Sequence, residues 1–284
     1  MKRLFCSAII GGALLAAPLS ALAQSRPLAT EDPETVPAGF ILLETGVDFL
    51  HGVTFPVSGL TGTLSRLGTF GVSFGVGSLA EIQVDGSMLN TLKITSINVV
   101  APLGPRYTGD SVSTSSFGDL TIGAKVRVVT ETETRPGLAV RFATGLPING
   151  PATGIGSSTT DFTVGLALGK TVESIRVVGN VGLGILGDPV IGSRQNHLLL
   201  YGMSIARAMG TGAELVAEFN GRLDTGSDEP PIGTDSLMVV RVGARFTHKS
   251  VRFDGGLLIG VTDRDPAWGF TAGATWVFKA FDVK

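Results

Sequence analysis

Residues 268–279, near the end of the chain, narrow the possible folds more than any other segment. From Trp268 to Phe278 every second residue is apolar, and the residues between them are glycine or threonine as far as Thr275. A period of two indicates a β-strand with one apolar face. Strands that cross a bilayer carry aromatic rings at both membrane interfaces. This face therefore predicts a membrane-spanning strand whose aromatic girdle consists of Trp268, Phe270, Trp276 and Phe278.

The amino terminus has the pattern of an export signal. Two basic residues precede an apolar run over about residues 8–22, which ends in the small-residue cleavage pattern Ala-Leu-Ala. This pattern predicts a signal peptide over residues 1–23 rather than a transmembrane helix, for which the run is short. The one cysteine, Cys6, lies inside this signal, so the mature chain from Gln24 would have no disulfide and no thiol.

The composition argues against an ordinary soluble protein. The 40 glycines among 284 residues are about twice the usual share of glycine, and charged residues are well below the usual quarter. The predicted mature chain has 20 basic and 24 acidic residues, a formal charge of −4, which gives no indication of a nucleic-acid partner. No apolar run after residue 23 approaches the length of about 20 residues that a spanning helix needs. A chain of this kind would cross a membrane as strands.

Strand-like alternation continues through the mature chain, and no segment has a convincing helical period. Long connections, the first of them at about 51–61, alternate with short turns, as in bacterial outer-membrane barrels. Hydrocarbon offers no hydrogen bonds, so every strand amide must pair within a closed sheet. We therefore predict an all-β fold, a single antiparallel transmembrane β-barrel of about 12 strands over residues 39–284, after a periplasmic lead at 24–38. The alternative is a soluble β-sandwich. The expected strands are approximately 39–50, 62–76, 81–96, 117–130, 136–148, 161–172, 175–187, 197–208, 212–224, 235–248, 250–262 and 267–281.

Most charged residues of these strands lie on the face opposite the apolar one. A Lys or Arg turned toward lipid near the midplane would cost about 2–4 kcal/mol. We therefore expect these residues to line the lumen, where they either set the selectivity of a passage or pair with one another and plug it. Twelve strands lie between narrow filled barrels and wide open ones, and glycines on inward faces would leave room for a narrow lumen. The predicted lumen-lining residues are Glu44, Asp48, Glu81, Asp85, Lys125, Arg127, Arg141, Glu214, Glu218, Arg222, Arg241, Arg245, Arg252 and Asp254.

Motifs that would indicate an enzyme are weak. Residues 182–187 match the glycine spacing of a dinucleotide site, but no helical pattern follows them to receive a pyrophosphate. Residues 165–171 fall one residue short of a phosphate-binding loop. The three histidines, His51, His197 and His248, are scattered at strand ends. The sequence therefore predicts no catalytic residue, no metal site and no cofactor, and a hydrolase site on the barrel wall is a remote alternative.

Several short motifs carry a family resemblance. The chain reads Arg-Pro-Leu-Ala-Thr-Glu-Asp at 26–32, Phe-Gly-Asp-Leu-Thr-Ile-Gly-Ala-Lys at 117–125 and Gly-Leu-Pro at 145–147. In these segments it resembles the transporter-like outer-membrane family named for the MetA pathway of phenol degradation. The resemblance implies an outer-membrane barrel for uptake of small, often aromatic or hydrophobic compounds, and it transfers no catalytic residue. The chain departs from the usual barrel ending, because it ends at Lys284 and its last aromatic residue is Phe281.

These observations predict a channel or transporter in a Gram-negative outer membrane, for passive passage of small compounds. A closed structural or adhesive barrel, whose exterior loops bind a ligand, is the alternative. The expected partners are outer-membrane lipid, a small-molecule solute and the barrel insertion machinery. The sequence leaves the solute and the oligomeric state open.

Overall fold

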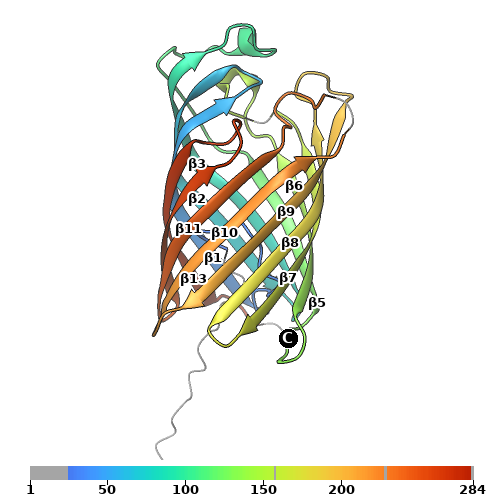
Figure 1. Ribbon diagram of the computed structural model, residues 1–284, viewed down its shortest axis with the longest axis vertical. Coiled ribbons are helices and arrows are strands. Elements are labelled where there is room, and N and C mark those ends of the chain that lie inside the picture. Colours follow the sequence, from blue (N-terminus) through green and yellow to red (C-terminus); the bar gives the residue numbers. More distant parts are fainter. Residues whose placement is uncertain (1–24, 157, 227–228, 283–284) are drawn as a thin grey trace, which may run out of the picture.

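The computed structural model describes residues 25–156, 158–226 and 229–282. Within them the chain forms one closed antiparallel β-barrel of twelve long strands (Figure 1). A short strand, β4 (Ser113–Ser116), and two 3-10 turns, η1 (Gly104–Arg106) and η2 (Pro151–Thr153), lie in loops. The long strands are β1 (Phe40–Phe55), β2 (Leu60–Val76), β3 (Ala80–Ile97), β5 (Leu120–Val129), β6 (Gly137–Leu146), β7 (Asp161–Val172), β8 (Ile175–Gly187), β9 (Gln195–Ala208), β10 (Ala213–Asp224), β11 (Leu237–His248), β12 (Val251–Gly260) and β13 (Trp268–Lys279).

The first and last strands close the barrel. β1 pairs with β13 from Phe40 opposite Lys279 to His51 opposite Trp268. Every other long strand pairs antiparallel with the long strand before it, and β4 only extends β3 above the rim. A closed ring leaves no unpaired strand edge. The predicted twelve-stranded antiparallel barrel is confirmed.

The longest connections all lie at one end of the barrel. Residues 98–119, 147–160 and 225–236 form the longest connections, all at the end drawn at the top of Figure 1. The opposite end has tight turns such as 173–174 and 249–250. We refer to these as the loop end and the turn end.

The expected loop at 51–61 is wrong, because β1 continues to Phe55 and a turn spans only 56–59. Gly52 has a φ of 73°, and the register between β1 and β2 shifts between Leu50 and Val53. A bulge changes the face that each following residue occupies, so the period of two breaks although the strand continues. β1, β2 and β3 consequently project beyond the rim (Figure 1).

The outer surface of the barrel is apolar. Phe142, Leu166 and Val181 on neighbouring strands are each about half exposed, with relative exposures of 54, 46 and 50%. Contiguous exposed apolar surface of this extent marks a surface that contacts lipid or a partner. Among the described residues, no helix is long and apolar enough to cross a membrane.

A charge on this outer surface should be costly if lipid covers it. Leu166 lies midway along β7 and faces outward. We expect Leu166→Arg to lower the free energy of unfolding in lipid vesicles by about 2–4 kcal/mol, as measured by urea titration. The control, Val190→Arg in a loop at the loop end, should change it by less than about 1 kcal/mol. Equal effects of the two variants would argue against lipid at Leu166.

Apolar side chains fill one side of the barrel interior at the loop end. Leu60, Leu64 and Leu92 from β2 and β3 are nearly inaccessible and pack against Ile155 of the 147–160 loop. Leu50 of β1 and Leu258 of β12 complete this cluster. The remaining space in the lumen therefore lies toward β6–β10.

Candidate functional site

Residues 25–38 lie inside the lumen, and we call them the internal segment. The sequence suggested a periplasmic lead here, but the described residues reach strands all around the barrel wall. The Arg26 guanidinium donates to the Thr271 hydroxyl of β13 at 2.8 Å, and the Thr30 amide donates to the Glu218 carboxylate of β10 at 2.9 Å. Polar and charged side chains of the wall form hydrogen bonds with the polar groups of the internal segment, in place of water.

Arg26 fixes the start of the internal segment between β1, β2 and β13. Its Nη1 donates to the Thr69 hydroxyl at 3.1 Å, while Nη2 donates to the Ala272 carbonyl at 3.0 Å. Two inward glycines make this contact possible. A Cβ on Gly46 would lie 2.3 Å from the guanidinium of Arg26, and one on Gly273 would lie 2.5 Å from it.

Glu218 holds the middle of the segment. Its carboxylate, which is inaccessible to solvent, accepts hydrogen bonds from the amides of Ala29 at 2.8 Å and Thr30 at 2.9 Å. Arg241 donates to the same carboxylate at 2.6 Å. Because a buried carboxylate is stable only when it is paired and hydrogen-bonded, Glu218 and Arg241 form one unit with the segment backbone.

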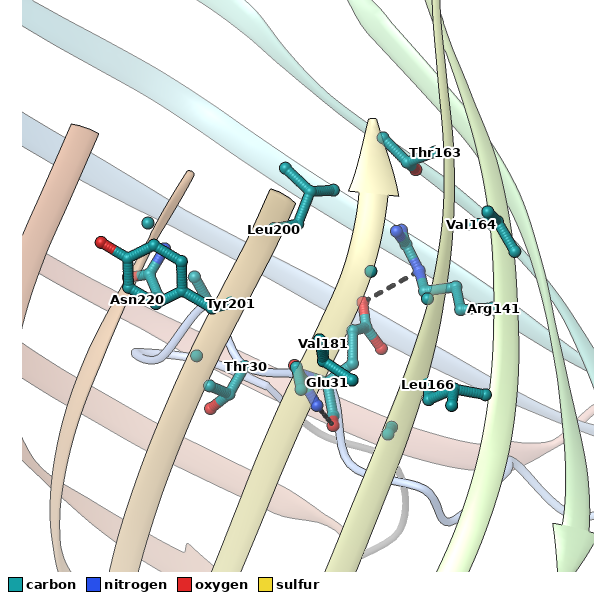
Figure 2. Close-up of a pocket in the computed structure, with 17 residues that line it drawn as sticks. Thr30, Glu31, Arg141, Thr163, Val164, Leu166, Val181, Leu200, Tyr201 and Asn220 are labelled. Carbon is teal, nitrogen blue, oxygen red and sulfur yellow. Dashed lines mark hydrogen bonds and ion pairs between the residues drawn. The ribbon is translucent and has the colours of Figure 1, made fainter. Parts of the chain in front are cut away.

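On the opposite wall, Glu31 meets two cations. Lys125 Nζ lies 3.4 Å from Glu31 Oε2. Arg141 Nε lies 3.3 Å from Glu31 Oε1, as Figure 2 shows. Lys125 is fully buried and also contacts Glu81, at 3.0 Å. Glu81 in turn accepts a hydrogen bond from the Val36 amide. The Lys125 ammonium thus links Glu31 of the internal segment to Glu81 of β3.

The acidic residues that follow Glu31 pair near the turn end. Arg176 binds both carboxylate oxygens of Asp32, at 2.5 and 2.6 Å, and reaches Glu131 at 2.9 Å. Glu34 pairs with Arg127. The two-point contact between Arg176 and Asp32 is the strong form of this ion pair.

The structure places the predicted lumen-lining residues on the inner face of the wall. Most of them contact the internal segment or one another. Arg222 and Arg252 make no ion pair within the described residues. The residues in contact are Glu44, Asp48, Glu81, Asp85, Lys125, Arg127, Arg141, Glu214, Glu218, Arg241, Arg245 and Asp254. A role in selectivity stays a prediction for all of them.

Sequence reasoning missed several inward polar residues. Gln83 donates a hydrogen bond to Glu81. The Asn180 side chain accepts a hydrogen bond from the Glu31 amide and donates one to the Glu31 carbonyl. Asn220 accepts from Arg241. The alternation contained this signal for Gln83 and Asn220, which lie two positions from the predicted inward residues Glu81 and Glu218.

A cavity of about 240 Å³ lies beside the internal segment, against β6–β10 (Figure 2). Ala29, Thr30 and Glu31 form one side of it, and the wall side includes inward glycines such as Gly165 and Gly182. Side chains longer than hydrogen at these positions would project into this space. The glycines therefore keep a narrow part of the lumen open next to the internal segment.

A second cavity, the vestibule, has a volume of about 450 Å³ and lies beneath the loops. Apolar residues from the strand ends and loops line part of it, including Phe55, Ile155 and Leu186. Arg66 and Arg222 contribute positive charge to the same cavity. The lumen thus contains an upper cavity with basic groups and a lower, smaller one bordered by the internal segment.

Aromatic residues of β13 gather at both ends of its outward face. Phe270 stacks on Phe49 with a centroid distance of 5.3 Å, close to Trp268 at the loop end. Trp276 and Phe278 lie 4.4 Å apart near the turn end. The structure thus places the predicted girdle residues on the outside, and their contact with membrane interfaces stays a prediction.

No protein-family model matches the chain, and no curated protein sequence matches it. Solved structures do. The COG4313 outer membrane channel from Pseudomonas putida F1 matches with a TM-score of 0.58 and 14% identity, over 87% of this chain and 98% of that one. The chain has the fold of outer-membrane channel barrels. The NanC porin matches with a TM-score of 0.51 and 8% identity, over 85% of this chain and 100% of that one.

These identities are low, so they support a shared channel-barrel fold and leave the narrower family resemblance a prediction. The resemblance to the family named for the MetA pathway rests on the short motifs of the sequence. The first of these, 26–32, lies in the internal segment, where its Arg, Glu and Asp residues make the wall contacts described above.

The histidines and the glycine motif lie on separate parts of the barrel. His51, His197 and His248 are on β1, β9 and β11, and the 182–187 motif lies within β8. In the described part of the chain, no three or more His, Cys, Asp or Glu side chains are grouped to hold a metal ion.

Proposed function

We propose that the chain is an outer-membrane channel for passive passage of small solutes, and that the internal segment is its gate. The supporting observation is how the segment is held. Hydrogen bonds and ion pairs join it to the wall, while the strands of the wall pair completely with one another. The segment can therefore leave the lumen without loss of any strand pairing.

Planar-bilayer recording tests conduction directly. The purified mature chain is expected to give discrete current steps. Arg141, which borders the cavity beside the segment, should influence the passing ions, so Arg141→Glu should shift the reversal potential toward cation selectivity. The matched variant Arg106→Glu, in an exposed loop turn, should leave the reversal potential unchanged. Silence of all three proteins would overturn the proposal and favour a closed barrel.

Acid should open this gate. Burial favours a higher pKa for Glu31, but Arg141 and Lys125 outweigh it, so the pKa of Glu31 is lowered from its ordinary 4.5. The ion pairs of Glu31 are then complete above pH 4.5 and are lost as the pH falls through the lowered pKa. We expect the open fraction to be constant near neutral pH and to rise only below pH 4.5, with a smaller rise in Glu31→Gln. An open fraction that grows with increasing pH would contradict the assignment.

We further propose that solutes with an apolar part are preferred, including aromatic ones. The support is the apolar part of the vestibule lining. Outer-membrane lipid would cover the outer wall, and the barrel insertion machinery would insert the barrel into that membrane. The predicted signal peptide at 1–23 lies outside the described residues. Osmotic swelling of proteoliposomes, compared for phenol and an equally sized sugar, tests the preference.

A closed adhesive barrel is the second candidate. Val99 and Val100, in the long 98–119 loop, are 76 and 84% exposed, which is unusual for apolar side chains of a loop. Such residues are typical of a contact surface. This candidate predicts silent bilayers together with binding of cells or matrix that Val99→Ser and Val100→Ser abolish.

A further inference from the structure

Two arginines line the vestibule, and each keeps guanidinium donors that no acceptor fills among the described residues. Arg176, in contrast, donates to both oxygens of Asp32 and to Glu131. Arg66 lies 3.9 Å from Asp48, and within the described residues its guanidinium donates no hydrogen bond. Arg222 donates to the carbonyls of Asp235 and Gly233 but has no ion pair in this part of the chain.

These two arginines face the same cavity from nearly opposite walls. Arg66 is on β2 and Arg222 on β10, which are five strands apart in the twelve-stranded ring. Both line the vestibule of about 450 Å³, and the side chain of Arg66 is 41% exposed within it. Unfilled guanidinium donors in a confined space are suited to an acceptor group with two oxygens, such as a carboxylate.

The carboxylates of the vestibule have structural partners. Asp161 accepts hydrogen bonds from the Gly187 amide at 3.1 Å and the Thr159 hydroxyl at 3.2 Å. Asp119 accepts from the amides of Ile148 and Asn149 at the start of the next loop. These acids hold strand and loop ends in place, because Oδ1 of each accepts the hydrogen bonds just described.

The geometry points to a binding site for a small organic anion in the vestibule, with the carboxylate of the anion on Arg66 and its body against the apolar lining. Arg222 adds positive charge from the opposite wall. Phe55, Ile155, Leu186 and Leu237 supply apolar surface in the same cavity. A molecule with one carboxylate and a short apolar body satisfies both kinds of surface. The site would make the vestibule the selective part of the proposed channel, and its role in transport rests on that proposed function.

Calorimetric titration of the full mature chain in detergent tests the site without any need for conduction. Hexanoate is the probe, hexanamide its neutral counterpart and hexylammonium its cationic counterpart. We expect hexanoate to bind more tightly than hexanamide, and Arg66→Gln to weaken hexanoate binding about tenfold, the effect of losing about 1.4 kcal/mol from a charge-assisted contact. Arg222→Gln should also weaken it, whereas Arg106→Gln, which removes an exposed loop arginine outside the vestibule, should not.

Three results would overturn the site: equal binding of hexanoate and hexanamide, unchanged hexanoate binding in Arg66→Gln, or preferred binding of hexylammonium, which would assign recognition to the acids instead. Each variant is first checked for the gel shift between heated and unheated samples that folded barrels give. Failure of the bilayer recordings would remove the transport role but would leave this titration fully informative, so the two proposals can fail separately.

Discussion

Replacing the three carboxylates of the internal segment by amides is expected to raise the open fraction of the proposed channel about tenfold or more. The variant is Glu31→Gln, Asp32→Asn and Glu34→Gln, which removes the ion pairs with Lys125, Arg141, Arg176 and Arg127. A shift of about 1.4 kcal/mol changes an equilibrium tenfold, and partly buried ion pairs with two-point contacts supply at least this much together. Single-channel recording in planar bilayers measures the open fraction.

The control for this variant removes the same charges elsewhere. Glu173→Gln, Glu229→Gln and Asp263→Asn change two glutamates and one aspartate that are exposed outside the lumen. They should leave the open fraction unchanged. If the internal-segment variant conducts no more often than this control, the segment is a fixed part of the barrel and not a gate.

Lys125→Met is expected to lower the free energy of unfolding by about 3–5 kcal/mol, the cost of removing one partner from a buried ion pair. Lys125 and Glu81 are both inaccessible, and Glu31 shares the same ammonium group. The methionine fills a similar volume but leaves the Glu81 carboxylate without its cation. Urea unfolding in lipid vesicles, followed by the fluorescence of Trp268 and Trp276, measures the change.

Two further variants interpret this measurement. Lys279→Met removes an ammonium group that is 58% exposed, and it should cost less than about 1 kcal/mol. Adding Glu81→Gln to Lys125→Met removes the unpaired charge and should restore a large part of the lost stability. If the double variant is no more stable than Lys125→Met alone, lost packing of the lysine stem, rather than the uncompensated carboxylate, explains the effect.

The barrel could be predicted because its strands repeat one simple constraint. Apolar residues alternate with polar ones along β5, β7 and β13, and this period alone assigns each side chain to a face. The pattern failed where a bulge changed the face, as at Gly52. There the chain kept its pairing while the period shifted by one residue.

The interior arrangement was predictable in part. A charged side chain in hydrocarbon is costly, so the sequence alone predicted that Lys125 and Arg141 point into the lumen. Their partners did not, because Glu31 lies in a segment without any periodic pattern, 94 residues from Lys125 in the chain. An extended, charged segment has the same composition in a solvent-exposed lead as in a lumen. Only the position of the wall charges after barrel closure distinguishes the two.

The pairing of β1 with β13 has a consequence for how the molecule is assembled. The internal segment precedes β1, yet Arg26 bonds to β13, the strand of the ring farthest from it in the chain, 245 residues later at Thr271. A nascent barrel with an open seam cannot offer these contacts. The internal segment can therefore adopt its place in the lumen only after the ring has closed. Before closure, Arg26 would lack its contacts with β13.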